Sequence, residues 1–135
     1  MLKKLIPYLF ISFFLIACAN ENGIEQADSG IDGGRGFIEN YMQGDMKKAK
    51  LYVLADAQNM AFFNKITNEY YALDKEGRMQ LRQASLQIDE VKTINEQTTV
   101  IYYRNSFDKT PRWVKVIATP KGWKVDLKFS YGPKI

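Results

Sequence analysis

The chain has 135 residues, 46% of them hydrophobic, and a formal net charge of +4 at pH 7. This length suits one domain with an additional segment at one end, and the composition excludes a collagen-like, disulfide-stapled or wholly disordered chain. The chain contains no histidine, which excludes serine–histidine and cysteine–histidine nucleophile pairs, histidine-ligated metals and the commonest general base. We therefore expect neither a metal site nor a cofactor.

The first 17 residues have the form of an export signal. Lys3 and Lys4 precede a predominantly apolar run of 13 residues, 5–17. That run is shorter than the roughly 20 residues of a membrane-spanning helix and falls within the roughly 7 to 15 residues of a secretory signal. It ends in Leu15-Ile16-Ala17-Cys18, which resembles the lipobox of bacterial lipoproteins.

The resemblance implies cleavage between Ala17 and Cys18, a diacylglyceryl group on the Cys18 sulfur and acylation of the new amino group. The alternative is an ordinary secretory signal in which the cysteine is incidental. Lipidation is favoured because an exported chain with one thiol has no disulfide partner, and because two or more acyl chains make a durable anchor. Residues 1–17 are thus predicted to be a signal peptide, and the lipid on Cys18 is predicted to hold the protein to a membrane.

These predictions place the protein in a bacterial cell envelope. Ala19 is similar to the residues that permit transfer of lipoproteins to an outer membrane, which favours the outer over the inner membrane. Removal of residues 1–17 takes away two lysines and no acid, so the formal charge falls from +4 to +2. This charge and an exported location argue against a nucleic-acid partner.

Residues 19–34 carry four acids, no base and few large apolar side chains, which is the composition of a linker. We therefore expect residues 18–34 to form a lipidated, flexible tether and residues 35–131 to form the folded domain.

The first part of the domain has helical periodicity. Phe37, Ile38, Tyr41 and Met42 share one helix face, and Gly44 suits the left-handed position that ends a helix. Asp45 is positioned to cap a second helix, which carries Met46, Ala49 and Val53. The next segment either continues that helix or restarts at Asp56, and another helix is expected from about Asp74 to Ala84.

After Ser85 the apolar period changes from helical to two. The phase slips at Asp89-Glu90, which indicates a β-bulge that bends the strand. Three further strands are expected within residues 98–106, 112–119 and 122–131. Helices followed by a curved four-stranded antiparallel meander define an α+β domain.

The side chains of the last hairpin select one register. With Ala118 opposite Trp123, one face pairs Val116 with Val125 and Val114 with Leu127, and the other pairs Lys115 with Asp126 and Trp113 with Lys128. A shift of one residue would place Val116 opposite Asp126 and spoil both faces.

The run Phe37-x3-Tyr41-x2-Gly44-Asp45-x3-Ala49-x2-Tyr52, with a final Trp123-Lys124-Val125, resembles small envelope lipoproteins with lumazine-binding-like domains. These belong to the nuclear transport factor 2-like superfamily, and the likeness covers roughly residues 35–130. It implies a cystatin-like cone in which a curved sheet wraps around helices, often with a pocket at the open end and often paired into homodimers. The superfamily includes isomerases and non-catalytic modules, so the fold alone does not assign a function.

The register places Trp123, Val125, Leu127 and Phe129 on the inner face, toward Phe37 and Tyr41. A small apolar ligand would then bind in a pocket lined by these apolar groups and by tyrosine side chains: Phe37, Tyr41, Tyr102, Tyr103, Trp123, Val125 and Leu127. The competing prediction is that the same side chains fill the core and leave no cavity.

Two functions are considered. The first is a non-catalytic, lipid-anchored domain that binds a small apolar ligand or an envelope partner. The second is an isomerase or dehydratase, which would need a carboxylate in an apolar pocket and a hydroxyl to stabilise an oxyanion. The candidate carboxylates are Asp56, Glu69, Asp89, Glu90 and Asp126. None of them lies clearly on the apolar face, so we expect no catalytic residue and a binding function.

The second half of the chain is basic, with arginines and lysines along its strands. These side chains either dock an anionic partner or keep an outward sheet face soluble and discourage edge pairing. The second interpretation is the simpler one.

Overall fold

The structure is a computed structural model that describes residues 26–131. The predicted signal peptide 1–17, the lipidation site Cys18 and the first part of the predicted tether lie outside the described residues.

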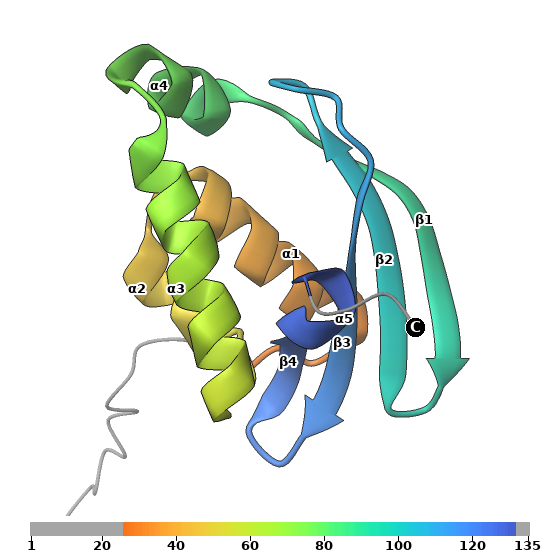
Figure 1. Ribbon diagram of the computed structural model, residues 1–135. Helices are drawn as coiled ribbons and strands as arrows, with labels where there is room; N and C mark the ends of the chain where they lie inside the picture. The colour runs from red at the N-terminus through yellow and green to blue at the C-terminus, as the bar shows by residue number, and fades with distance from the viewer. Residues whose placement is uncertain (1–25, 132–135) are drawn as a thin grey trace, which may run out of the picture.

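Within residues 26–131, four helices precede the sheet and a short one follows it (Figure 1). The elements are α1 (Gly30–Met42), α2 (Met46–Leu51), α3 (Ala57–Ala72), α4 (Lys75–Gln83), β1 (Leu86–Asn95), β2 (Thr98–Asn105), β3 (Arg112–Thr119), β4 (Gly122–Asp126) and α5 (Leu127–Tyr131). The four strands form one antiparallel sheet in chain order. The predicted α+β class is confirmed, and the arrangement is compatible with a nuclear transport factor 2-like cone.

Helix α1 begins at Gly30, five residues before the predicted domain start at Arg35. Its buried face includes Gly30, Gly33 and Gly34 as well as Phe37. These glycines were assigned to the tether because of its linker-like composition, but they belong to the helix. A Cβ at Gly33 would lie 2.8 Å from the carbonyl oxygen of Trp123, which shows how closely α1 approaches the sheet. The boundary of the tether at residue 34 is therefore wrong.

The helix ends follow the predicted capping pattern. Gly44 has a φ of +76° after α1, and the Asp45 side chain accepts a hydrogen bond from the Lys48 N–H to begin α2. Asp56 caps α3 in the same way, which selects the restart over the continuation, and Asp74 caps α4. Each carboxylate satisfies an N–H group that the first turn of a helix leaves free.

The register of the sheet agrees with the pattern of the sequence. The bulge predicted at Asp89 is present, and a second irregularity follows at Ile94. In the last hairpin Ala118 pairs with Trp123, Val116 with Val125 and Lys115 with Asp126, as predicted.

The predicted last strand is too long. Strand β4 ends at Asp126, so Val114 does not pair with Leu127, nor Trp113 with Lys128. The Leu127 N–H donates to the side-chain oxygen of Asn59, and the Lys128 N–H donates to Asp126. These bonds turn the chain into α5 and leave Phe129 45% exposed instead of inward. The Lys115 ammonium lies over the Phe129 ring, 6.0 Å from its centroid, and not in an ion pair with Asp126.

The outer edge of β4 is covered by chain from the N-terminal half. Val53 forms a parallel bridge with Val125, and the Trp123 N–H donates to the carbonyl of Ala27 at 3.3 Å. Strand β1 is the other edge of the sheet, and its residues are exposed or half-buried.

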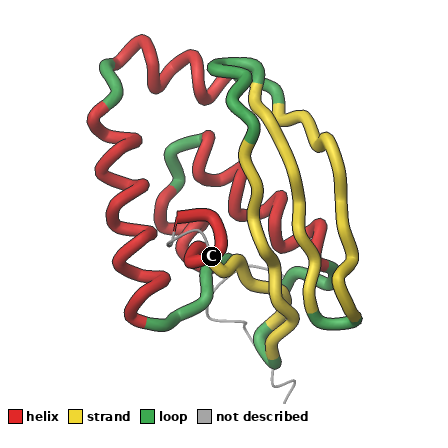
Figure 2. The backbone as a smooth tube through the Cα atoms, turned by 45° about the vertical axis from the view of Figure 1, so that its right-hand side comes forward, coloured by secondary structure: helices red, strands yellow, loops and turns green. Residues whose placement is uncertain are grey.

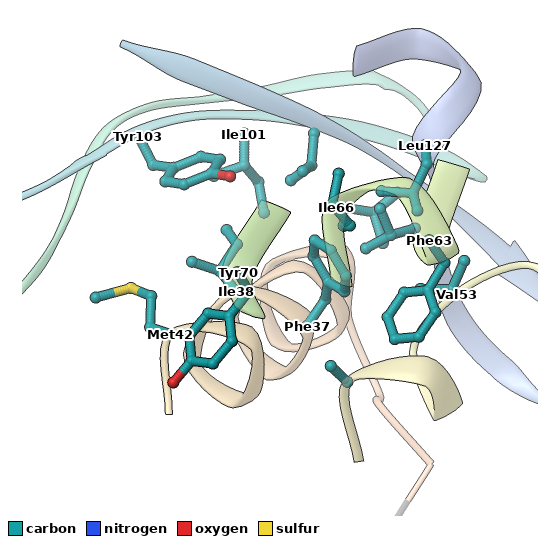
Figure 3. Close-up of a cluster of buried hydrophobic side chains, with 14 of the residues drawn as sticks. Phe37, Ile38, Met42, Val53, Phe63, Ile66, Tyr70, Ile101, Tyr103 and Leu127 are labelled. Carbon is teal, nitrogen blue, oxygen red and sulfur yellow. The ribbon is translucent and has the colours of Figure 1, made fainter. Parts of the chain in front are cut away.

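The core lies between the helices and the concave face of the sheet (Figure 2). Figure 3 shows Val53, Phe63 and Leu127 at one end of the buried cluster. Ile38, Met42 and Tyr103 lie at the other end.

Candidate functional site

A cavity of about 350 Å³ extends from that second end of the core. It is lined by α1, the second half of α3, α4, the end of β2, the β2–β3 loop and the start of β3. Its size falls within the range of small-molecule pockets, roughly 300 to 1,000 Å³. The residues are Phe37, Ile38, Tyr41, Met42, Ile66, Glu69, Tyr70, Leu73, Leu81, Tyr103, Asn105, Phe107, Asp108 and Arg112.

The helix side of the cavity is aromatic. The Phe37 and Tyr41 rings stack with centroids 6.2 Å apart, and Tyr70 meets Tyr41 edge-on at 5.8 Å. The Tyr41 hydroxyl donates to the carbonyl of Ile66 at 3.0 Å, which ties α1 to α3. Aromatic contacts of this kind hold rigid, flat surfaces against which an apolar molecule can pack.

Three polar side chains of the lining lie in the β2–β3 loop or at the strand ends beside it. The side chain of Asn105 accepts hydrogen bonds from the N–H groups of Phe107 and Asp108 and so shapes the loop. Arg112 binds both carboxylate oxygens of Asp108, at 2.9 and 2.6 Å. This pairing lowers the pKa of Asp108, so the rim carries a closed ion pair beside an apolar wall.

Three of the seven predicted pocket residues line this cavity: Phe37, Tyr41 and Tyr103. Val125 and Leu127 are fully buried at the far end of the core, and Trp123 packs against Gly33 near the start of α1. Tyr102 lies on the opposite face of β2, because side chains alternate along a strand, and the Lys92 ammonium lies 5.2 Å from the centroid of its ring. Phe37, Tyr41 and Tyr103 thus line a cavity, whereas Val125 and Leu127 fill the core.

The α3 wall of the cavity was missed in the sequence, although its signal is present. Ile66, Tyr70 and Leu73 recur at helical spacing after the cap at Asp56. The Tyr70 hydroxyl is buried without a hydrogen-bond partner among the described residues and packs against Gly44, where a Cβ would lie 2.4 Å from it. Phe107 and Arg112 carry no local signal, because the loop reaches the cavity only through the curvature of the sheet.

Of the five candidate carboxylates, only Glu69 lines the cavity, and its side chain is exposed. Asp89 pairs with Arg104 at 2.9 Å beside solvent, next to Glu90. Asp56 and Asp126 lie away from the cavity and belong to a structural cluster.

That cluster joins the start of α3 to the end of β4. Asn59, fully buried, donates to both Asp56 and Asp126 and accepts from the Leu127 N–H. The Lys128 ammonium lies 3.1 Å from Asp56. The N–H and side-chain amide of Asn59, with Lys128, lower the pKa of Asp56 from 3.8 to about 2. Each polar group in the cluster has a partner, which is the condition for a polar cluster to stabilise a fold.

Within residues 26–131, no group of acidic or cysteine side chains is placed to hold a metal ion. No helix of that part of the chain is both long and apolar enough to cross a membrane. No family model, no curated protein and no solved structure matches the chain.

Proposed function

We propose that the protein is a lipid-anchored lipoprotein of the bacterial envelope whose folded domain binds a small apolar ligand in the cavity without transforming it. The observation that carries this proposal is the cavity of about 350 Å³, walled by stacked aromatic rings. The lipobox around Cys18 supports the anchor. The helix–Gly44-Asp45–helix corner and the curved meander support membership of the lumazine-binding-like group.

The ligand is expected to be uncharged over most of its surface. The walls contributed by α1, α3 and α4 consist of aliphatic and aromatic side chains apart from Glu69. The Arg112 guanidinium is the one cation among the described lining residues, and it is bound to Asp108. Removing an unpaired charge from water would cost several kcal/mol, so an apolar molecule with one or two polar groups suits the site best.

The position of the cavity bears on how ligand reaches it. The cavity opens between α4 and the β2–β3 loop, whereas the described chain begins beside Gly122 in the β3–β4 hairpin. Figure 1 shows these features at opposite ends of the domain. Residues 19–25 between the lipidation site and this hairpin span at most about 25 Å. The mouth therefore points away from the membrane, and ligand is exchanged with the aqueous side of the envelope.

Binding without catalysis is proposed because the lining lacks the parts of a proton-transfer site. Such a site needs a carboxylate held in a dry pocket within reach of the substrate. Glu69 is the only one of the candidate acids in the lining, and solvent reaches it. A catalytic alternative would have to use this residue or Asp108, the other carboxylate among the described lining residues, whose two oxygens are bound by Arg112.

A neutral fluorescent probe, N-phenyl-1-naphthylamine, tests the proposal in the chain that starts at residue 18 and carries Cys18→Ser. Leu73→Trp places a large ring in the cavity, and Leu51→Trp makes the same change on an exposed leucine outside the lining. We expect saturable 1:1 binding to the parent and to Leu51→Trp, and at least tenfold weaker binding to Leu73→Trp. Equal affinity in all three, or no saturable binding to the parent, would contradict the proposal.

A further inference from the structure

The free edge of β1 has features of an interface. The other edge of the sheet is occupied by Val53 and Ala27, whereas among the described residues β1 pairs only with β2. Figures 1 and 2 show β1 at the margin of the molecule. An open strand edge presents unpaired N–H and C=O groups that can bind another strand.

Exposed apolar side chains lie along this edge. Val91 is 41% exposed and Ile94 is 58% exposed. Val91 pairs with the buried Ile101, so it lies on the concave face of the sheet, beyond the cover of α1. The regular part of β1 between its two irregularities is Glu90–Thr93.

We propose that a second copy of the chain pairs antiparallel with β1, with Val91 of one copy opposite Val91 of the other. Within the regular part of β1 this register places Glu90 opposite Lys92 twice, once on each side of the two-fold axis. Such an interface is isologous, since the same segment serves both copies. It joins the two sheets into one eight-stranded sheet with both concave faces on the same side.

Charge selects this register over its neighbours. If both concave faces stay on the same side, the strands can shift only to a register that keeps the alternation of side chains. The two nearest such registers place Glu90 opposite Glu90 or Lys92 opposite Lys92. Like charges directly opposite each other are unfavourable. Within one chain Glu90 and Lys92 lie 3.9 Å apart with their side chains about half exposed. An exposed pair of this kind contributes little, and so does an exposed contact of the Lys92 ammonium with the Tyr102 ring. Both side chains can therefore exchange these contacts for an ion pair with the second copy.

Cysteine cross-linking of the full chain in its own membrane tests the register. Val91→Cys brings two thiols together at the two-fold axis, and oxidation should convert most of the protein to a disulfide-linked dimer. Thr93→Cys, two residues along the same strand and face, should give at least tenfold less, because its thiol lies away from the two-fold axis and does not face its own equivalent. The parent chain is the control for any cross-linking through Cys18.

Charge reversal tests the pairing of Glu90 with Lys92. In the Val91→Cys chain, either Lys92→Glu or Glu90→Lys alone should reduce cross-linking at least fivefold. Co-expression of these two variants should restore it as a heterodimer, because each Glu then meets a Lys. Equal cross-linking at positions 91 and 93, absence of cross-linking at 91, or indifference to the charge reversals would each overturn the interface. Ligand binding does not enter this experiment, so its outcome is independent of the proposed function.

Discussion

At the residue scale, the closeness of α1 to the sheet depends on glycine. A Cβ at Gly33 would meet both the carbonyl oxygen and the Cβ of Trp123 at 2.8 and 2.9 Å. Because the carbonyl belongs to the backbone of β4, it cannot move aside without shifting the strand. On this face of α1 the helix backbone therefore packs directly against the sheet, with no side chain between them.

Gly33→Ala is expected to lower the free energy of unfolding by about 1 to 3 kcal/mol through overpacking, although alanine favours a helix by up to about 1 kcal/mol. Gly77→Ala in α4 is the matched control. Its Cβ would lie 3.0 Å from the exposed side chain of Asp74 and make ordinary contacts with the side chain of Leu73 at 3.6 and 3.8 Å. No backbone atom is in the way, so this variant should be unchanged or more stable. Urea unfolding of both variants measures the difference; equal stability of the two would show that α1 does not pack as described.

Asp56 links the start of α3 to the pH dependence of stability. Its folded-state pKa is about 2, below the ordinary value of 3.8, chiefly because Asn59 donates to it. A lowered folded-state pKa stabilises the fold above the unfolded pKa, and the stabilisation is lost as the pH falls from about 4 to about 2. Asp56→Asn keeps an amide oxygen that can cap the helix but does not ionise.

The free energy of unfolding of the parent should thus fall more steeply between pH 4 and pH 2 than that of Asp56→Asn. Denaturant titrations at a series of pH values provide the measurement. The remaining carboxylates are common to both proteins, so their contributions cancel in the comparison. Parallel curves would mean that Asp56 gains no stabilisation from its hydrogen bonds.

At the element scale, the corrected start of the domain changes what a truncation should do. A chain that begins at Gln26 keeps the Ser29 cap and the whole of α1, and should unfold as cooperatively as the chain that begins at residue 18. A chain that begins at Arg35 loses that cap, worth about 1 kcal/mol, together with the contacts of Gly30, Gly33 and Gly34. It should be less stable by more than this amount in thermal or urea unfolding. Equal stability would restore the boundary at residue 34.

The elements that could be predicted are those that depend on local chemistry. The Asp45, Asp56 and Asp74 caps, the left-handed Gly44 and the bulge at Asp89 each follow from one residue type in one pattern, and all are present. Two boundaries were wrong because a distant residue decides them. The glycines of α1 become a helix face only against Trp123 and Ile101, and β4 stops because Asn59 from α3 captures the Leu127 N–H.

The candidate site could likewise be predicted only in part. Phe37 and Tyr41 were found from helical periodicity, and Tyr103 from its strand. Trp123, Val125 and Leu127 do face inward, but the cavity lies at the opposite end of the core from Val125 and Leu127. The alternation of side chains along a strand shows which face of the sheet each one occupies, but not at which end of the core it lies. Phe107 and Arg112 were not predicted, because the β2–β3 loop has no such periodicity.

At the scale of the whole molecule, the described chain begins at the end of the domain opposite the cavity (Figure 1). Cys18→Ser should release the protein from the membrane and leave an unprocessed precursor, because no other thiol can carry the lipid. Partition into detergent and the mass of the purified chain provide the measurement. Processing and detergent partition at the level of the parent would contradict the lipoprotein assignment. Folding of residues 26–131 should be unaffected, since the anchor lies outside the domain.

The central claim is that the cavity between α4 and the β2–β3 loop holds a small apolar molecule, and native mass spectrometry tests it most directly. The protein is purified from cells in which it occurs naturally, and its mass is compared before and after denaturation. We predict a non-covalent excess of a few hundred daltons on the native protein, which denaturation removes and which Leu73→Trp, expressed in the same cells, lacks. A native mass equal to that of the lipidated chain alone, or an excess that Leu73→Trp retains in full, would contradict the claim.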